Sequence, residues 1–217
     1  MFKFNKLLLI IFIIVTANFE ISYAKIIITG TVMKITEGGH IIVSKGQSQI
    51  IQNNNIFRAN LILYNRYRNS IVSYGKIDIH LQIQKDEFIE AQGEQAQFCF
   101  NRKIGKLVGG TQQVIIKYFK KNLIMPYCTL YSDQLYFDQN TLEAYNNVKV
   151  VTKYGFIRSN NAFFNNNCAI FKSDKNRPTA DILYNNMKIF CKANEILFSF
   201  ENNKIIMKGN IKCTIKT

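Results

Sequence analysis

Apolar and polar residues alternate along most of this chain after residue 25. Between residues 77 and 83, isoleucine or leucine occupies every second position, and Asp78, His80 and Gln82 occupy the positions between them. A two-residue period with one mostly polar face is typical of antiparallel β-sheet that is wet on one side. No stretch after residue 25 has the 3.6-residue period of an amphipathic helix. The pattern therefore predicts an all-β fold with little helix.

The alternating segments recur in pairs, each made of a short strand, a polar turn and a second strand that begins with Gly or Asn. Repetition on this scale predicts stacked supersecondary units, in which neighbours cover the apolar faces that a single unit cannot bury. The five pairs are residues 58–64 with 73–79, 94–100 with 108–116, 132–137 with 145–151, 180–184 with 185–191, and 194–200 with 208–215.

Glycine or asparagine recurs where the second strand of each pair begins. Two interpretations are open: a corner or bulge at which the sheet bends over on itself, or separate turn residues in separate loops. The corner interpretation predicts two facing sheets. Residues 155–179, which are Asn-rich and contain Pro178, are expected to be irregular. The candidate corner residues are Gly75, Gly109, Gly110, Asn146, Asn147, Asn185, Asn186 and Gly209.

Residues 1–24 have the features of a secretory signal peptide. Two lysines precede an apolar stretch over residues 7–15, and Ser22-Tyr23-Ala24 provides a small-x-small cleavage site. We therefore predict export with cleavage, which leaves residues 25–217 as a single domain. The alternative is an uncleaved segment that tethers the chain to the inner membrane.

The chain is strongly basic, with a formal net charge of +14. Such a surplus attracts anions such as phosphate groups, lipid headgroups or acidic glycans. Nucleic acid is not predicted as a partner, because the predicted export separates the chain from it and the basic residues form no recognisable binding module.

Five cysteines, Cys99, Cys128, Cys168, Cys191 and Cys213, are present. None has C-x-x-C spacing and no histidine clusters near them, so the sequence indicates no metal site and no cofactor. Cys191 and Cys213 lie on the apolar parity of their strands. They are interpreted as buried thiols, or as a bridge that would join the C-terminal strands.

Catalysis requires a nucleophile with a base, paired carboxylates or a metal cluster. The two histidines, His40 and His80, are separated by many strands, and the acidic residues are scattered over turns. The sequence therefore predicts a protein that is not an enzyme.

The rungs of this chain resemble the OstA-like, or LptA-like, periplasmic β-jellyroll family of lipopolysaccharide transport. The matching segments are residues 59–64 with 75–79, residues 90–98 with Gly110, and residues 208–213, and the resemblance covers roughly residues 30–217. It implies a folded-over antiparallel β-jellyroll whose interior holds the acyl chains of lipopolysaccharide or a related glycolipid. It also implies head-to-tail stacking, through edge strands, with further copies and with other jellyroll proteins of the transport system, which bridges the inner and outer membranes.

In this interpretation the lipid-binding residues are apolar side chains on the inward parity of the strands. Outward lysines, among them Lys76, Lys106, Lys117, Lys149 and Lys188, are candidates to meet phosphate groups. Two alternatives remain: an interior packed only with its own side chains, and an exported adhesion or structural module that binds glycans without lipid. The predicted lining residues are Leu61, Leu63, Ile77, Ile79, Phe98, Phe100, Val114, Ile116, Leu135, Phe137, Val148, Val150, Ile189, Phe198 and Phe200.

Overall fold

The computed structural model describes residues 26–84, 86–120, 125–173, 176–184, 187–199 and 204–216. Residues 1–24, Asn185, Asn186 and Phe200 lie outside this range. The described residues fold almost entirely as β-strands, with one 3₁₀ turn at Glu37–Gly39. The prediction of an all-β fold with little helix is confirmed. Within the described ranges, no helix is long and apolar enough to cross a membrane.

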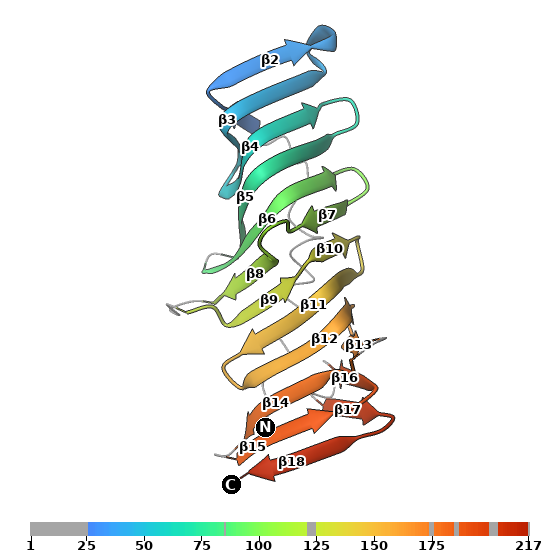
Figure 1. Ribbon diagram of the computed structural model, residues 1–217. Helices are drawn as coiled ribbons and strands as arrows, with labels where there is room; N and C mark the ends of the chain where they lie inside the picture. The colour runs from blue at the N-terminus through green and yellow to red at the C-terminus, as the bar shows by residue number, and fades with distance from the viewer. Residues whose placement is uncertain are drawn as a thin grey trace.

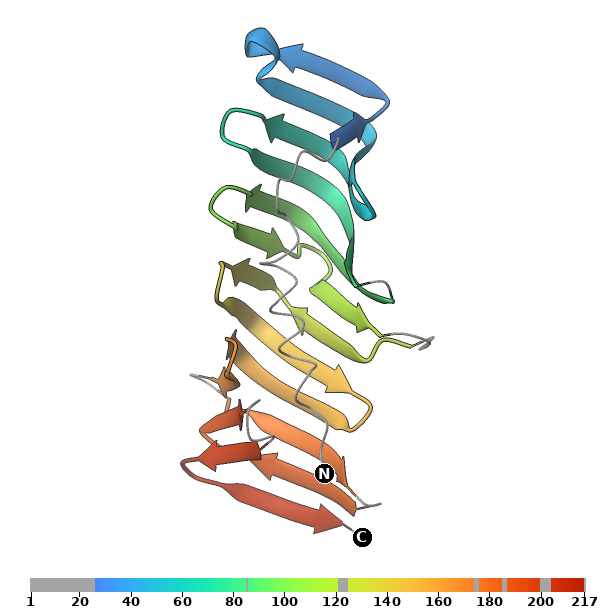
Figure 2. The same cartoon turned by 180° about the vertical axis from the view of Figure 1, so that it is seen from behind.

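All strand pairings are antiparallel and join the strands into one 18-stranded sheet (Figures 1 and 2). The strands are β1 (Ile26–Thr29), β2 (Val32–Thr36), β3 (Ile41–Gln52), β4 (Asn55–Asn65), β5 (Ser70–Gln84), β6 (Glu87–Cys99), β7 (Ile104–Val108), β8 (Val114–Phe119), β9 (Cys128–Ser132), β10 (Gln134–Phe137), β11 (Leu142–Thr152), β12 (Gly155–Phe164), β13 (Cys168–Lys172), β14 (Thr179–Tyr184), β15 (Met187–Lys192), β16 (Glu195–Ser199), β17 (Lys204–Lys208) and β18 (Lys212–Lys216).

This single sheet is folded over into two arms. The long strands β3, β4, β5, β6, β11 and β12 belong to both arms. The two halves of β3, β6, β11 and β12 each pair with a different neighbour on one side; β3, for example, pairs with β2 along its first half and with β1 along its second. β4 and β5 lie between β3 and β6 and pair with their neighbours along both halves. One arm adds β2, β7, β10, β13, β16 and β17, and the other adds β1, β8, β9, β14, β15 and β18. Figure 1 shows the resulting ladder, from β2 at the top to β18 at the bottom.

Four corners between the arms are built from pairs of consecutive residues with positive φ. In β3, β5 and β11 these pairs coincide with shifts in strand register. Glycine and asparagine tolerate this left-handed backbone better than other residues do, so the corner interpretation is confirmed for Gly75, Asn146, Asn147 and Gly209. The pairs, with their φ angles, are Gly46 (70°) and Gln47 (46°), Gly75 (72°) and Lys76 (44°), Asn146 (61°) and Asn147 (52°), and Gly209 (67°) and Asn210 (44°).

Gly109 and Gly110 also lie where the chain passes from one arm to the other, between β7 and β8, as Gly209 lies between β17 and β18. Unlike Gly209, neither has a positive φ. The left-handed backbone of the other corners is therefore not used at this position.

Residues 155–179 are not irregular, so that expectation is wrong. They contain β12 and β13, and Pro178 precedes β14, where its carbonyl accepts a hydrogen bond from the backbone N–H of Ala193. The alternation in β12 was hidden because its buried positions change parity at the bend, from Ile157 to Ala162 and Phe164.

A similar parity change corrects two predicted lining residues. In β4, Phe57 and Ala59 are buried before the bend and Ile62 is buried after it. Successive strand residues point to opposite faces, so Leu61 and Leu63 point to the outer face, and their predicted inward orientation is wrong. The prediction had carried an unbroken two-residue period through the corner.

The C-terminal end of the sheet is joined by covalent and ionic links. Cys191 on β15 lies directly opposite Cys213 on β18, and the two form a disulfide. Cys191 is buried but Cys213 is exposed, so the interpretation as two buried thiols is wrong and the bridge interpretation is confirmed. Glu195 accepts contacts from Lys172 Nζ at 2.9 Å and Lys208 Nζ at 3.3 Å. The hydrogen bond from Lys172 is the main reason that the pKa of Glu195 lies below its ordinary value.

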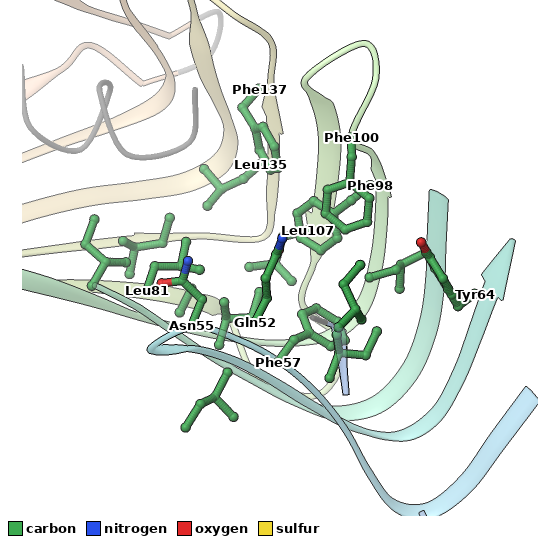
Figure 3. Close-up of a pocket in the computed structure, with 18 of the residues that line it drawn as sticks. Gln52, Asn55, Phe57, Tyr64, Leu81, Phe98, Phe100, Leu107, Leu135 and Phe137 are labelled. Atoms are coloured by element: carbon green, nitrogen blue, oxygen red, sulfur yellow. The ribbon is translucent and has the colours of Figure 1, made fainter. Parts of the chain in front are cut away.

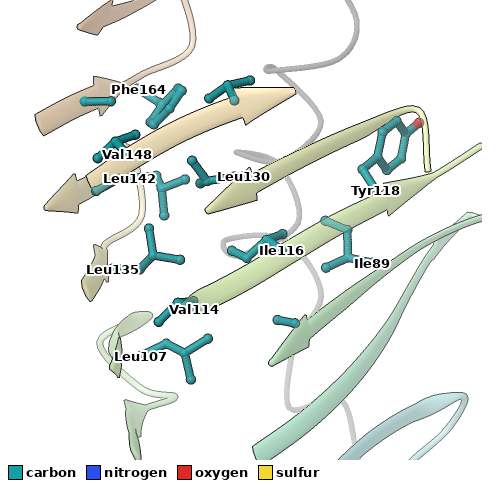
Figure 4. Close-up of a cluster of buried hydrophobic side chains, with 14 of the residues drawn as sticks. Ile89, Leu107, Val114, Ile116, Tyr118, Leu130, Leu135, Leu142, Val148 and Phe164 are labelled. Carbon is teal, nitrogen blue, oxygen red and sulfur yellow. The ribbon is translucent and has the colours of Figure 1, made fainter. Parts of the chain in front are cut away.

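The core between the arms is packed differently along the molecule. Towards the C-terminus, Phe164, Phe171 and Phe198 are almost completely buried, and Figure 4 shows the buried cluster in the middle of the sheet. Towards the N-terminus, Phe98 and Phe100 are only half-buried. The interior is therefore filled by its own side chains at one end and less completely covered at the other.

Candidate functional site

An apolar trough lies between the two arms in the N-terminal half of the molecule (Figure 3). Both arms contribute side chains, because β4, β5 and β6 bend around it. The trough is lined by Ile26, Ile50, Gln52, Asn55, Ile56, Phe57, Tyr64, Asn69, Ile71, Ile79, Leu81, Ile89, Ala91, Phe98, Phe100, Leu107, Ile116, Leu135 and Phe137.

Aromatic rings meet across the trough. Phe57, from the first half of β4, packs edge-to-face on Phe98, from the second half of β6, with ring centroids 5.8 Å apart. Phe98 also packs against Phe137 at 5.4 Å. The contact between Phe57 and Phe98 shows that the inner faces of the two arms touch one another at this point.

The space left open inside the trough is about 80 Å³. One water molecule needs about 10–15 Å³ on this measure, so the opening accepts only a few groups of that size. A longer apolar molecule therefore requires the arms to separate or the half-buried phenylalanine rings to turn.

Four polar side chains interrupt the apolar lining, and three of them have protein partners. Tyr64 Oη donates to Asn69 Oδ1 at 3.2 Å, and Asn69 Nδ2 donates to Asn101 Oδ1 at 2.9 Å. Asn55 Oδ1 accepts from the backbone N–H of Gln82 at 2.9 Å. Burial raises the pKa of the Tyr64 hydroxyl, which keeps it protonated as a donor. Gln52 is the fourth polar residue.

The structure places the fifteen predicted lining residues in different surroundings. Six of them line the trough: Ile79, Phe98, Phe100, Ile116, Leu135 and Phe137. Ile77, Val114, Val148, Val150 and Phe198 are buried in the core outside it, and Ile189 is half-buried on β15. Leu61 and Leu63 point outward, and Phe200 lies outside the described residues.

Sequence reasoning missed several residues that line the trough. Phe57 shares the parity of Ala59, which the alternation had already assigned to the inner face, so extending that strand backwards would have found it. Leu107 is the inward residue of the short strand β7. Gln52 could not have been found this way, because the pattern assigns polar residues to the outer face.

Outward lysines lie beside aromatic rings on the other face of the sheet. Lys106 Nζ lies 4.8 Å from the centre of the Tyr136 ring. Lys149 Nζ lies 5.8 Å from the Tyr131 ring and 5.4 Å from the Phe156 ring. Attraction between the ammonium groups and the ring faces holds these lysines along the outer surface of the sheet.

A second groove, lined mainly by polar side chains, crosses the outside of the corners of β3 to β6. In it, Arg58 pairs with Asp78 at 3.2 Å, and Glu94 accepts hydrogen bonds from Thr111 Oγ1 at 2.6 Å and Thr111 N at 2.8 Å. The hydroxyl hydrogen bond is the first reason that the pKa of Glu94 is lowered. The groove presents amides, charges and hydroxyls, the groups that bind sugars.

Reactive and metal-binding groups are sparse in the part of the chain that the structure describes. That part holds no group of three or more His, Cys, Asp or Glu residues able to bind a metal ion. Burial raises the pKa of the Cys128 thiol to about 12, which keeps it protonated and poorly nucleophilic at neutral pH. His80 packs against Phe88, with ring centroids 4.9 Å apart.

No protein-family model matches this chain, and no curated protein matches its sequence. Among solved structures, a similar one is the crystal structure of LptH, the LptA homologous periplasmic component of the lipopolysaccharide transport device from Pseudomonas aeruginosa. The two share 8% sequence identity, with a TM-score of 0.36, over 90% of this chain and 97% of that chain. The fold described above rests on the strand pairing of this chain and not on this likeness.

Proposed function

We propose that this protein is a periplasmic carrier that shelters the acyl chains of lipopolysaccharide or a related glycolipid in the trough. The observation that carries the proposal is an open, almost entirely apolar space between the two arms, beside which Phe98 and Phe100 are only partly buried. A self-packed sandwich would bury Phe98 and Phe100 as completely as Phe198. The rung pattern of the sequence, which resembles the lipopolysaccharide-transport β-jellyroll family, supports the same assignment.

The energetic need for such a trough follows from the hydrophobic effect. Each methylene group removed from water contributes about 0.8 kcal/mol, so one twelve-carbon chain left exposed would cost roughly 9 kcal/mol. Contact with Ile79, Leu81, Phe98 and neighbouring side chains offsets most of that cost. The sugar and phosphate portion would remain outside, where the basic surface attracts it.

The two ends of the sheet support the proposed head-to-tail assembly. Among the described residues, β1 and β2 at one end and β17 and β18 at the other each pair along one side only. Val32 and Ile35 on β2 and Ile215 on β18 are about 60% exposed. An unpaired strand is a template for another strand, so a second copy or another jellyroll protein would continue the sheet.

The carrier proposal is tested by extracting lipid from the purified protein and identifying it by mass spectrometry. We expect bound glycolipid in the wild type. Replacing Phe137→Gln, in the trough, should reduce it, whereas Tyr136→Gln, on the outer face of the same strand, should retain it. A wild-type protein that carries no acyl lipid after gentle purification would contradict the proposal.

The predicted signal peptide belongs to the same proposal. Cleavage after Ala24 would place Lys25 at the mature N-terminus and release the domain of residues 25–217 into the periplasm. Sequencing of the N-terminus of the exported protein tests this directly. Recovery of an intact residue 1 in the membrane fraction would indicate a tethered protein instead.

The groove outside the corners favours a second candidate function, an exported module that binds glycans without lipid. The Arg58 and Asp78 side chains in this groove form an exposed ion pair, and both are groups that can hydrogen-bond to sugar hydroxyls. Glycan binding by lipid-free protein, lost in Arg58→Ala and retained in Phe137→Gln, would favour this function over the carrier.

A further inference from the structure

Gln52 is buried inside the trough without a hydrogen-bond partner. It is the last residue of β3 and only 8% exposed, and Figure 3 shows its amide pointing towards Leu107. Across the described ranges, no protein group hydrogen-bonds to this side chain, whereas Asn55, Tyr64 and Asn69 in the same trough all have partners.

A buried, unpartnered amide is unusual and needs an explanation. A primary amide has two N–H donors and an oxygen acceptor, and most buried polar groups in folded proteins are hydrogen-bonded. Leucine or methionine would fill nearly the same volume without leaving these groups unsatisfied. The protein therefore carries a destabilising group in an otherwise apolar trough, and a ligand that bonds to the amide accounts for it.

We propose that Gln52 recognises the linking carbonyl of an acyl chain, and that the trough selects amide-linked chains over plain alkyl chains. The Gln52 Nε2 group would donate to the ligand carbonyl, and Oε1 would accept from the ligand amide N–H. The side-chain amide and the ligand amide would thus each provide a donor and an acceptor for the other. This inference rests on the proposed carrier function. It adds which group of the ligand the protein recognises, namely the amide that links the acyl chain. Apolar contacts alone do not distinguish an amide-linked chain from a plain alkyl chain. A ligand that lacks the amide would leave the buried Gln52 amide without a hydrogen bond, so it would bind less tightly.

The test uses two soluble amphiphiles with the same sugar head and a dodecyl-length chain, one joined through an amide and the other through an ether. Their affinities are measured below micelle-forming concentrations, by displacement of an apolar fluorescent dye from the full-length protein. The variants are Gln52→Leu and, as a matched control, Gln95→Leu. Gln95 is exposed on the outer face of β6, next to the buried Ala96, and lies outside the trough.

We expect the wild type and Gln95→Leu to bind the amide-linked compound about two- to tenfold more tightly than the ether-linked one, the ratio that one neutral hydrogen bond provides. Gln52→Leu should bind both compounds equally. Without ligand, Gln52→Leu should also melt at the same temperature as the wild type or higher, because an unsatisfied buried group has been removed.

Each contrary result has a distinct meaning. A preference for the amide that persists in Gln52→Leu overturns the role of Gln52 and leaves the carrier function intact. A large fall in the melting temperature of Gln52→Leu overturns it as well, because the amide would then be a structural group. Failure of both compounds to displace the dye from the wild type overturns the carrier function and this inference together.

Discussion

Two phenylalanines in similar sequence contexts should respond differently to truncation, because one lines the trough and the other lies in the closed core. Phe198 is 1% exposed, and its replacement by alanine leaves a cavity that costs about 3–5 kcal/mol of unfolding free energy. Phe98 is only partly buried. Phe98→Ala loses part of a phenylalanine's burial and two ring contacts, which together amount to about 2 kcal/mol.

The two variants should also differ in binding. Phe98→Ala enlarges the trough, so an apolar dye should bind at least as tightly as it does to the wild type, whereas Phe198→Ala should leave binding unchanged. Urea unfolding followed by circular dichroism gives the free energies, and dye titration gives the affinities. If Phe98→Ala costs as much stability as Phe198→Ala and leaves dye binding unaltered, the trough is an ordinary closed core and the reasoning is refuted.

Four further predictions concern the framework. Replacing Cys191 and Cys213 by serine should lower the unfolding free energy by about 3 kcal/mol, the entropy of a 22-residue closed loop, as measured by urea unfolding with and without reductant. Asn146→Val should cost about 1–2 kcal/mol at a φ of 61°, whereas Asn146→Gly should be nearly neutral in the same assay. Because the folded-state pKa of Glu195 is lowered from 4.5, its ion pairs stabilise the fold above pH 4.5 and lose that contribution as the pH falls through the lowered value. Glu195→Gln should thus be less stable than the wild type at pH 7 by up to about 1 kcal/mol and should equal it in acid. Ile215→Lys, on the exposed edge strand, should reduce self-association in analytical ultracentrifugation while leaving the melting temperature unchanged.

The fold class was predictable because period-two alternation is a local signal that survives in nearly every strand. The recurring glycine and asparagine positions also marked real corners, since a left-handed backbone restricts the residue type wherever it occurs. At Gly75 the restriction is doubled, because a Cβ there would lie 2.8 Å from Asn60 Nδ2. Each such constraint acts on the residue type at one position, so the corner positions can be predicted from a single sequence.

The details of the trough were less predictable, because they depend on what happens inside each corner. β5 and β11 keep their parity by inserting two positive-φ residues, whereas β4 changes parity at its bend. The local sequence Asn60-Leu61-Ile62 contains no signal for that change of parity, so Leu61 and Leu63 were assigned to the wrong face. Gln52 was missed for a different reason: its orientation is set by the pairing of β3 with β1 and β4, which no local pattern reveals.

The difference between the two halves determines where the arms can separate to admit an acyl chain. Opening the C-terminal half would expose Phe164, Phe171 and Phe198 at a cost of about 5–9 kcal/mol, a sum comparable with the whole stability of a typical domain. In the trough, Phe98, Phe100 and Phe137 are already partly exposed. Contacts such as that between Phe57 and Phe98 contribute only about 0.5–1.5 kcal/mol beyond their burial. A chain that enters the trough replaces those contacts with its own methylene groups. Opening is therefore least costly in the N-terminal half, while the packed C-terminal half keeps the two arms together.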